Sequence, residues 1–337
     1  MPDVLSYPPA APARDRFVLE RRGPRLAHDP WRYQGLIVED ERAANGTVDR
    51  LATVFLTGRE CPWRCAMCDL WKHTIASDTP EGAIATQVST ARTHLRERAE
   101  PLAGMKLYNA GSFFDPRAVP EVDYDDIAAA LSGLSRVIVE SHPTLVGPRV
   151  DRLRSALDRH DHGQPAALEV AMGLETAHPE ALDALNKRFR LDEFAAAARA
   201  LKERDVALRV FLLISPPFIA PEEQDEWLLQ SLDAAFACEA SVVSLVPTRS
   251  GNGTMETLAK MGMFRPPGLE DIERTFALAL THAAGRGRVF VDLWDLDRFA
   301  HCNRCLAGRY ARLEAMNLQQ AVLAPCPCPT RGPAVVS

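Results

Sequence analysis

Three closely spaced cysteines are the side chains of this sequence best suited to chemistry. Cys61, Cys65 and Cys68 lie in the segment CPWRCAMC, so one short loop presents three thiols. Three thiolates can ligate three irons of a cubane cluster, which leaves the fourth iron open to a small molecule. The alternatives are a zinc site or a redox pair, but zinc sites usually combine two cysteine pairs, and no second pair lies nearby. The triad therefore predicts a 4Fe-4S cluster with one open iron.

The composition sets the broad class of the protein. The chain has 337 residues, a formal net charge of −6 and eight cysteines. The negative charge argues against a strongly basic nucleic-acid-binding surface. No segment approaches the ~20 apolar residues that cross a bilayer, and the N-terminus lacks the pattern of a secretory signal. We therefore expect a cytoplasmic protein without membrane contact, in which clustered cysteines bind metal rather than form disulfides.

Short apolar runs alternate with helical patterns through most of the chain. The runs predict strands at 51–58, 104–112, 135–141, 167–175, 206–215, 240–247 and 288–294. Helical spacing of apolar residues predicts helices at 124–134, 192–205, 222–240 and 269–285. Strands that alternate with helices form parallel sheets buried on both faces. We expect an α/β fold with a partial or complete parallel barrel, whose site residues follow the C-terminal ends of the strands.

Polar and small residues follow several of the predicted strands. The cysteine triad comes just after the first strand, and later strands end next to Asn109, Gly111, Ser112, Glu140, Ser141, His142 and Glu175. A carboxylate and an imidazole at a barrel mouth are site candidates, so Glu140 and His142 are the candidate catalytic residues. The alternative for His142 is a hydrogen-bonded loop residue. Arg249 and Asn252, after the sixth strand, are weaker candidates for contact with a substrate.

The spacing of the triad resembles the defining motif of the radical S-adenosylmethionine (SAM) superfamily. Further segments occur in the order of one branch of it, between about residues 50 and 268: KLYNAGSFFDP, VESHP, LEVAMGLET, LNKRF, LISPPF, GTMETL and FRPP. Together they resemble the radical SAM subunit of archaeosine synthase and its bacterial relatives, a branch that is similar to the elongator catalytic subunit. The resemblance implies a partial (β/α)6-type parallel barrel.

The resemblance also implies a chemistry. SAM would chelate the open iron, and one electron from the cluster would cleave SAM to a 5'-deoxyadenosyl radical that abstracts hydrogen from a substrate. A flavodoxin or ferredoxin would donate the electron. The implied substrate is a modified nucleobase or tRNA, with a partner subunit that contacts the tRNA. Two alternatives stay open, a radical SAM enzyme for a small metabolite or natural-product precursor, and a non-catalytic metal-binding or redox-sensing protein.

Residue roles follow from the same resemblance. It implies cofactor contacts for Met67, Asn109, Gly111, Ser112, Ser141, Glu175 and Lys187. Glu175 would contact the ribose of SAM, and Lys187 would pair with its carboxylate. Arg188 competes with Lys187 for that role, and a charge on a helix surface is the alternative for Lys187. The segment NAGS departs from the usual Gly-rich motif of the superfamily, in which the third residue is a glutamate.

The two ends of the chain lie outside the resemblance. Residues 1–48 are expected to form an N-terminal extension, disordered to about residue 15 and with solvated arginines over 13–27. Residues 49–287 are the predicted core barrel. Residues 288–337 form a predicted C-terminal extension with four cysteines, Cys302, Cys305, Cys326 and Cys328. Four cysteines suit a structural zinc or an auxiliary Fe–S cluster; the alternative is thiols without a ligand.

Overall fold

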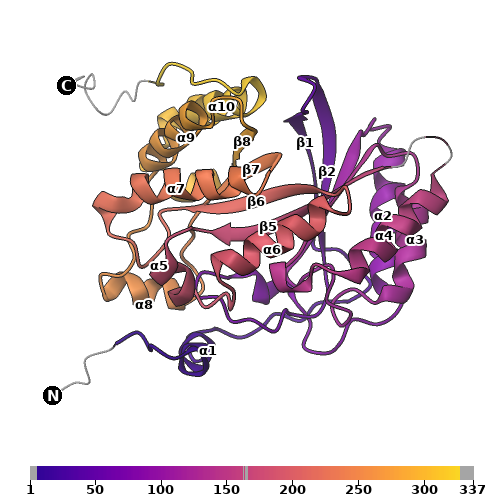
Figure 1. The fold of residues 1–337 in the computed structure, drawn as a ribbon, viewed down its shortest axis with the longest axis horizontal. Helices are drawn as coiled ribbons and strands as arrows, with labels where there is room; N and C mark the ends of the chain where they lie inside the picture. Colours follow the sequence, from indigo (N-terminus) through magenta and orange to yellow (C-terminus); the bar gives the residue numbers. More distant parts are fainter. Residues whose placement is uncertain (1–5, 162, 164–165, 327–337) are drawn as a thin grey trace.

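The computed structural model describes residues 6–161, 163 and 166–326. The strands are β1 Gly35–Arg42, β2 Val48–Leu56, β3 Gly104–Asn109, β4 Arg136–Glu140, β5 Ala167–Glu175, β6 Ala207–Ile214, β7 Val242–Pro247 and β8 Arg288–Val291. The α-helices are α1 Ala11–Leu19, α2 Ala83–Glu97, α3 Tyr124–Leu131, α4 Pro148–His160, α5 Pro179–Ala184, α6 Leu191–Lys202, α7 Gln224–Ala237, α8 Thr254–Lys260, α9 Leu269–Ala283 and α10 Asn303–Gln319. Figure 1 shows a twisted sheet through the middle of the molecule, with helices packed against it.

The sheet has the simplest possible order, from β1 to β8 along the chain. β1 pairs antiparallel with β2, and each later strand pairs in parallel with the one before it. Parallel pairing brings the C-terminal ends of β2 to β8 to one edge of the sheet, where loops can form a site. The predicted α/β half-barrel is therefore confirmed.

The predicted strands and helices all occur, with ends shifted by a few residues. The antiparallel strand β1 and the helices α1, α2, α4, α5, α8 and α10 were not predicted. β1 and β8 belong to the same sheet as the strands of the predicted core, residues 49–287, although both lie outside that range. The limits of the core stay a prediction. Among the described residues, no helix has the length and apolar character needed to span a membrane.

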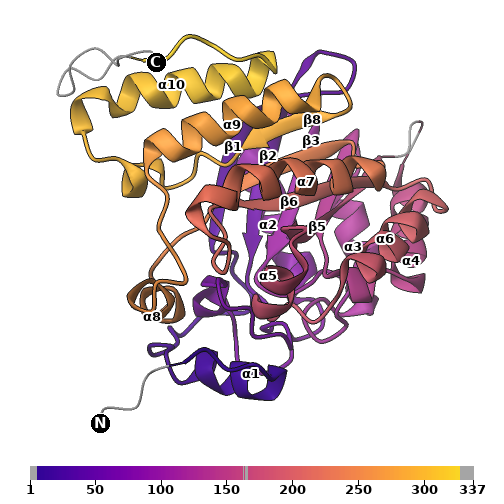
Figure 2. The same ribbon diagram turned by 60° about the vertical axis from the view of Figure 1, so that its left-hand side comes forward.

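The expectation of disorder to about residue 15 is wrong from residue 11 onward. Helix α1 begins there, with a proline in its first turn, where the missing N–H leaves no bond unmade. Arg14, Phe17 and Val18 are buried. The Arg14 guanidinium donates to the carbonyl oxygen of Asp183 at 2.6 Å. Contacts with residues far away in the sequence thus stabilise an N-terminal segment whose composition suggests disorder. Figure 2 shows α1 at the end of the molecule opposite α10.

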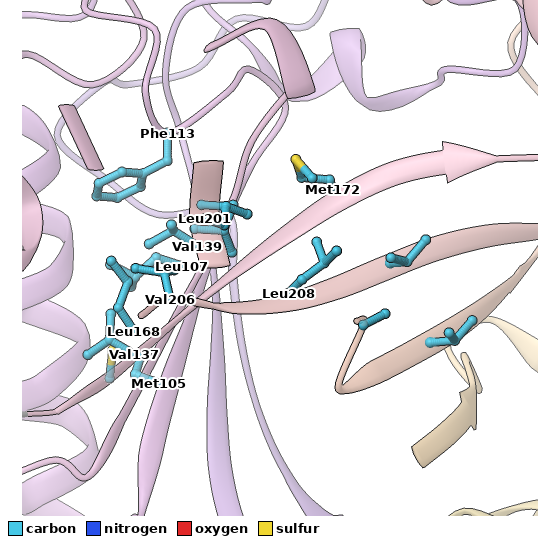
Figure 3. Close-up of a cluster of buried hydrophobic side chains, with 14 of the residues drawn as sticks. Met105, Leu107, Phe113, Val137, Val139, Leu168, Met172, Leu201, Val206 and Leu208 are labelled. Atoms are coloured by element: carbon cyan, nitrogen blue, oxygen red, sulfur yellow. The ribbon is translucent and has the colours of Figure 1, made fainter. Parts of the chain in front are cut away.

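The outer face of the sheet carries the main hydrophobic core. Side chains of alternate strand residues point to this face and meet the helices that cover it. Figure 3 shows part of this core: Met105, Leu107, Val137, Val139, Leu168 and Leu208. Consecutive parallel strands are thereby held in a fixed register, and the residues between these positions face the concave side of the sheet.

The concave side is sealed at the N-terminal end of the parallel strands by buried charges. The Arg209 guanidinium lies 2.7 Å from a carboxylate oxygen of Glu41 and 2.5 Å from one of Glu169. Lys106 pairs with Glu41 at 2.8 Å, and Arg136 pairs with Glu169 at 3.2 Å. Each charge has an opposite partner, which offsets the loss of hydration on burial. The charged groups at this end are paired with one another. The end of the half-barrel that is left for a ligand is therefore the one at the C-terminal ends of the parallel strands.

Helix α10 covers the free edge of β8. The side-chain amides of Asn317 and Gln320 each bind both the N–H and the C=O of one β8 residue, Val291 and Val289, at 2.7–2.9 Å. Four backbone groups are satisfied as if by a ninth strand, which protects the edge from pairing with another chain. The Arg42 guanidinium of β1 reaches a carbonyl oxygen at the end of α10 at 3.2 Å. α10 thus links the first and last strands of the sheet.

Candidate active site

The cysteine triad lies in the loop after β2, as predicted. Cys65 is buried, and Cys61 and Cys68 are half-buried. Burial raises the pKa of each thiol to about 12, and a neighbouring thiol of the triad adds to each rise. The three groups therefore share one electrostatic environment. Among the described residues, no three His, Cys, Asp or Glu side chains are gathered closely enough for a single metal ion. A bound cation would stabilise the thiolates and reverse these shifts.

Arginines of the N-terminal segment hold the start of the cysteine loop. Glu60 directly precedes Cys61, and its carboxylate lies 2.7 Å from the Arg22 guanidinium and 3.1 Å from that of Arg64. Arg25 binds the other carboxylate oxygen. The Arg22 and Glu60 side chains are only 8% and 9% exposed, so the expectation of solvated arginines is wrong here. Buried charge pairs constrain geometry more than exposed pairs do.

Glu175 and Lys187 form a buried ion pair at the end of β5. Lys187 Nζ lies 2.5 Å from Glu175 Oε1. Glu175 has a positive φ of 69° and follows an irregularity in the pairing of β5 with β6. Such strain in a residue other than glycine is typical of functional positions. Burial alone would lower the pKa of Lys187, but the charges of Glu175 and then Cys65 raise it. The pair thus adjoins the cysteine loop.

Lys187 and its competitor Arg188 have different surroundings. Lys187 lies in the loop between α5 and α6 and is 8% exposed, so it is not a charge on a helix surface. Its competitor Arg188 instead pairs with Asp15 near the N-terminus, at 2.7 Å. A Cβ at Gly173 would lie 2.2 Å from Glu175 Oε1 and 2.6 Å from Lys187 Nζ. A glycine there leaves room for the pair.

Residues after β3 and β4 form a hydrogen-bonded group beside this pair. The hydroxyl oxygens of Ser112 and Ser141 lie 3.0 Å apart, and the backbone N–H of His142 donates to Ser112 at 3.0 Å. The His142 ring nitrogen Nε2 bonds the carbonyl oxygen of Lys187 at 2.8 Å. The same ring stacks on Trp63 of the cysteine loop, with ring centres 3.5 Å apart. His142 thereby joins three loops of the site.

The two candidate catalytic residues have opposite surroundings. Burial, and then the charge of Lys187, lowers the pKa of His142 to about 3, so its ring stays neutral. Burial raises the pKa of Glu140 to about 8. The Glu140 carboxyl is half-buried and has no hydrogen bond or ion pair with any residue that the structure describes. A partly desolvated carboxyl without a partner is suited to bind a cation or a hydrogen-bond donor.

The end of β3 offers a further test of fit for a bound cofactor. The side-chain oxygen and nitrogen of Asn109 are buried, and neither has a partner within the described part of the chain. Buried polar atoms are normally satisfied, so a ligand is their natural partner. A Cβ at Gly111 would lie 2.7 Å from the carbonyl oxygen of Arg59 and 3.0 Å from Asn109 Nδ2. The residues at this strand end therefore fit a polar ligand beside the cysteine loop.

Other predicted site residues lie at the edge of this group or away from it. Met67 packs against a small apolar cluster that includes Met255, beside Cys68. Arg249 binds Asp292 at 2.7 Å. Asn252 contacts the backbone of the cysteine loop, a role that local sequence did not indicate.

The C-terminal cysteines lie around helix α10. Cys302 directly precedes α10, and Cys305 is buried in its first turn. The chain then returns, so that Cys326 Sγ lies 3.1 Å from the position of a Cβ at Gly308. Cys328 lies outside the described residues. Cys326 thus lies against α10, the helix that contains Cys305.

Comparisons with known proteins point to one family, although no family model matches the chain. Archaeosine synthase subunit beta of Methanosarcina acetivorans is 28% identical over 239 residues, 68% of this chain and 66% of that protein. An uncharacterised protein of Methanocaldococcus jannaschii is 24% identical over 247 residues, again 66% of its length. The match thus spans about two thirds of each relative.

Solved structures agree on the fold. Elp3 of Methanocaldococcus infernus has a TM-score of 0.50 at 14% identity, covering 69% of this chain and 59% of that one. Methylornithine synthase has a TM-score of 0.50 at 13% identity, covering 71% and 64%. Both are radical SAM enzymes. The chain is thus similar in sequence to archaeosine synthase subunit beta and similar in fold to radical SAM enzymes.

Proposed function

We propose that Cys61, Cys65 and Cys68 hold a 4Fe-4S cluster and that the adjoining strand ends bind SAM for reductive cleavage. The observation that carries the proposal is the convergence of two independent features. The three-thiol loop after β2 and the Glu175–Lys187 pair after β5 are joined through His142, whose ring stacks on Trp63 and bonds the carbonyl oxygen of Lys187 at 2.8 Å. The ammonium group of Lys187 beside this loop can bind an anionic group of a ligand, such as a carboxylate.

The chain's own residues would bind and orient the cofactor. When bound, the cluster and SAM supply a 5'-deoxyadenosyl radical that abstracts hydrogen from a substrate. Lys187 offers a cation to the SAM carboxylate, and Glu175 offers a carboxylate to the ribose hydroxyls. The Asn109 amide can both donate to and accept from the cofactor. Gly111, Ser112 and Ser141 shape the adjoining wall, and Met67 packs behind the loop. Glu140 remains available to hold a substrate or cofactor group.

We infer a modified nucleobase, free or in tRNA, as the substrate, because the relative with 28% identity is a subunit of archaeosine synthase. A flavodoxin or ferredoxin would supply the electron in the cytoplasm. Because the chain carries a net charge of −6, a partner subunit would have to provide most contacts to tRNA phosphates.

A second candidate substrate is a small metabolite or natural-product precursor. The observation that favours it is the link from β8 through α10 to β1, which covers the free edge of the sheet. A substrate would then have to reach the site from the open end of the half-barrel. Salt-sensitive binding of tRNA would favour the nucleobase reading, and absence of binding at low salt would favour the small molecule.

Anaerobic reconstitution tests the proposal directly. The wild-type chain with iron, sulfide, dithionite and SAM should release 5'-deoxyadenosine. Cys65→Ala should abolish the release, and Cys238→Ala, directly after α7 and away from the triad, should leave it unchanged. Zinc instead of iron at the triad of the purified protein would contradict the proposal and favour a non-catalytic metal-binding or redox-sensing protein.

We also propose that the C-terminal cysteines form a second metal site, either a zinc or an auxiliary Fe–S cluster. The return of the chain brings Cys326 to the helix that carries Cys305, and Cys302 adjoins it. The Arg312 guanidinium fixes this return by donating to the carbonyl oxygen of Ala324 at 2.8 Å. Metal analysis of Cys305→Ser should show the loss of one zinc or of several irons, with the triad's cluster retained. An unchanged metal content would refute the second site.

A further inference from the structure

Two buried asparagines from different loops bind the backbone of the cysteine loop. Asn252, after β7, donates its side-chain amide to the carbonyl oxygens of Ala66 at 2.8 Å and Cys68 at 3.2 Å. Its side-chain oxygen accepts from the backbone N–H of Met255 at 2.8 Å. Asn252 is 4% exposed. An amide NH2 has two donors, so one side chain can hold two carbonyls and fix their spacing.

Asn186, in the loop between α5 and α6, binds the backbone of the same cysteine loop. Its amide donates to the carbonyl oxygen of Arg64 at 2.8 Å, and the backbone N–H of Ala66 donates to the carbonyl oxygen of Leu185 at 3.0 Å. Asn186 is 1% exposed and has a φ of 63°. Asparagine is among the few residues that adopt this backbone conformation readily. Its position and side chain are therefore both adapted to this contact.

These contacts matter because loops with metal ligands are otherwise free to rearrange. Fixing the backbone of one residue costs about 1–2 kcal/mol of conformational entropy. If the loop were disordered before metal binding, the cluster would have to supply that free energy for several residues. Here three carbonyls of Arg64, Ala66 and Cys68 are bound by side chains of the protein itself.

We propose that Asn252 and Asn186 are positioning residues that hold the cysteine loop in its ligand-presenting conformation before a cluster binds. The inference rests on the proposed function for the meaning of that conformation. Because Asn186 directly precedes Lys187, the chain segment that fixes the loop also places the cation of the proposed SAM site. Loss of the asparagine contacts should therefore loosen the thiols first and the cofactor site second.

Asn252→Asp in the full chain separates this role from general stability. Aspartate keeps the acceptor for the N–H of Met255 but has no donor for the loop carbonyls. Asn317→Asp is the matched control, because it keeps the acceptor for Val291 on β8 and loses the donor there, far from the loop along the chain. Asn186→Gly is a second test, since glycine accepts the positive φ without strain and lacks the amide.

The main measurement is the rate at which iodoacetamide labels Cys65 in the cluster-free protein, read by mass spectrometry of the peptides. Loss of hydrogen bonds worth about 1–2 kcal/mol should speed labelling about 5- to 30-fold in Asn252→Asp and Asn186→Gly. Asn317→Asp should label at the wild-type rate. After anaerobic reconstitution, the two loop variants should also bind iron about 10- to 100-fold more weakly in a chelator competition.

The outcomes distinguish this inference from the proposed function. Labelling of Cys65 in both loop variants no faster than in Asn317→Asp would overturn the positioning role. If labelling speeds up as expected but wild-type protein builds no 4Fe-4S cluster, the asparagines hold the loop and the proposed function is wrong. Circular dichroism of each variant shows that the fold is retained, and whichever loop variant folds decides the question.

Discussion

Gly173→Ala should damage the proposed SAM site while it leaves the fold largely intact. Gly173 lies on β5 under the Glu175–Lys187 pair. An added Cβ would be 2.2 Å from Glu175 Oε1 and 2.6 Å from Lys187 Nζ. Ordinary contacts are roughly 3.5 Å, so the ends of these side chains must move by about 1 Å. Both contacts are with flexible ends of side chains, so the backbone of β5 can stay in place.

The structure sets the size of each effect. Removing one partner of a buried pair costs about 3–5 kcal/mol, but here both charges remain and can pair again after the shift. We therefore expect the free energy of unfolding to fall by about 1–2 kcal/mol, as for modest overpacking. If the pair holds SAM as proposed, a displacement of about 1 Å should slow SAM cleavage roughly 100-fold.

Gly104→Ala is the control for this experiment. A Cβ at Gly104 would lie 2.6 Å from the backbone oxygen of Arg136, at the opposite end of the strands. Because backbone cannot move aside as a side chain can, this variant should lose more stability than Gly173→Ala. It should still cleave SAM normally at temperatures where it is folded. Urea unfolding and 5'-deoxyadenosine release measure the two effects, and wild-type cleavage by Gly173→Ala would refute the reasoning.

Three further predictions concern the frame of the barrel. Arg209→Met should lower the free energy of unfolding by about 3–5 kcal/mol in urea, because the buried carboxylates of Glu41 and Glu169 lose the guanidinium between them and keep only Lys106 and Arg136 as partners. Burial opposes ionisation of Glu41, but the charges of Arg209 and then Lys106 hold its pKa well below the usual range. Its stabilising effect is therefore complete above about pH 5 and lost as the pH falls through the folded-state value, so melting temperature should drop below about pH 4. Asn317→Ala, which uncovers the β8 edge, should lower stability by about 1–3 kcal/mol and promote self-association in light scattering, with SAM cleavage unchanged.

The strands and the cysteine loop could be predicted because their signals are local. Strands that are buried on both faces are short apolar runs, and a cysteine triad with fixed spacing carries its meaning within eight residues. Strand β1 was not predicted because its acidic residues Glu39 and Glu41 point to the concave side of the sheet, where Lys106 and Arg209 neutralise them. Charged residues that face the inside of a barrel interrupt the apolar pattern of a strand. Their partners lie far away in the sequence, so the sequence alone does not show that these charges can be buried.

The same reason explains the errors at the two ends of the chain. A Pro- and Ala-rich N-terminus suggests disorder, yet contacts of Arg14 and Arg22 with residues far along the chain fix it. The amides of Asn252 and Asn317 bind backbone groups. Because every residue carries the same backbone groups, the residue types in the sequence do not indicate these contacts. Such contacts can be found only when the distant segments are brought together in space.

The structure separates the proposed cofactor site from the C-terminal segment that covers the edge of the sheet. The cysteine loop, the Glu175–Lys187 pair and His142 are tied to one another by direct contacts, so a change in one should be felt by all. The C-terminal segment from residue 288 instead forms the edge strand β8 and the helix α10 that covers it. Changes there can alter which molecules reach the open end of the half-barrel without moving the thiols. If the proposed radical step takes place at the cysteine loop, the C-terminal segment is therefore the place to look for substrate specificity.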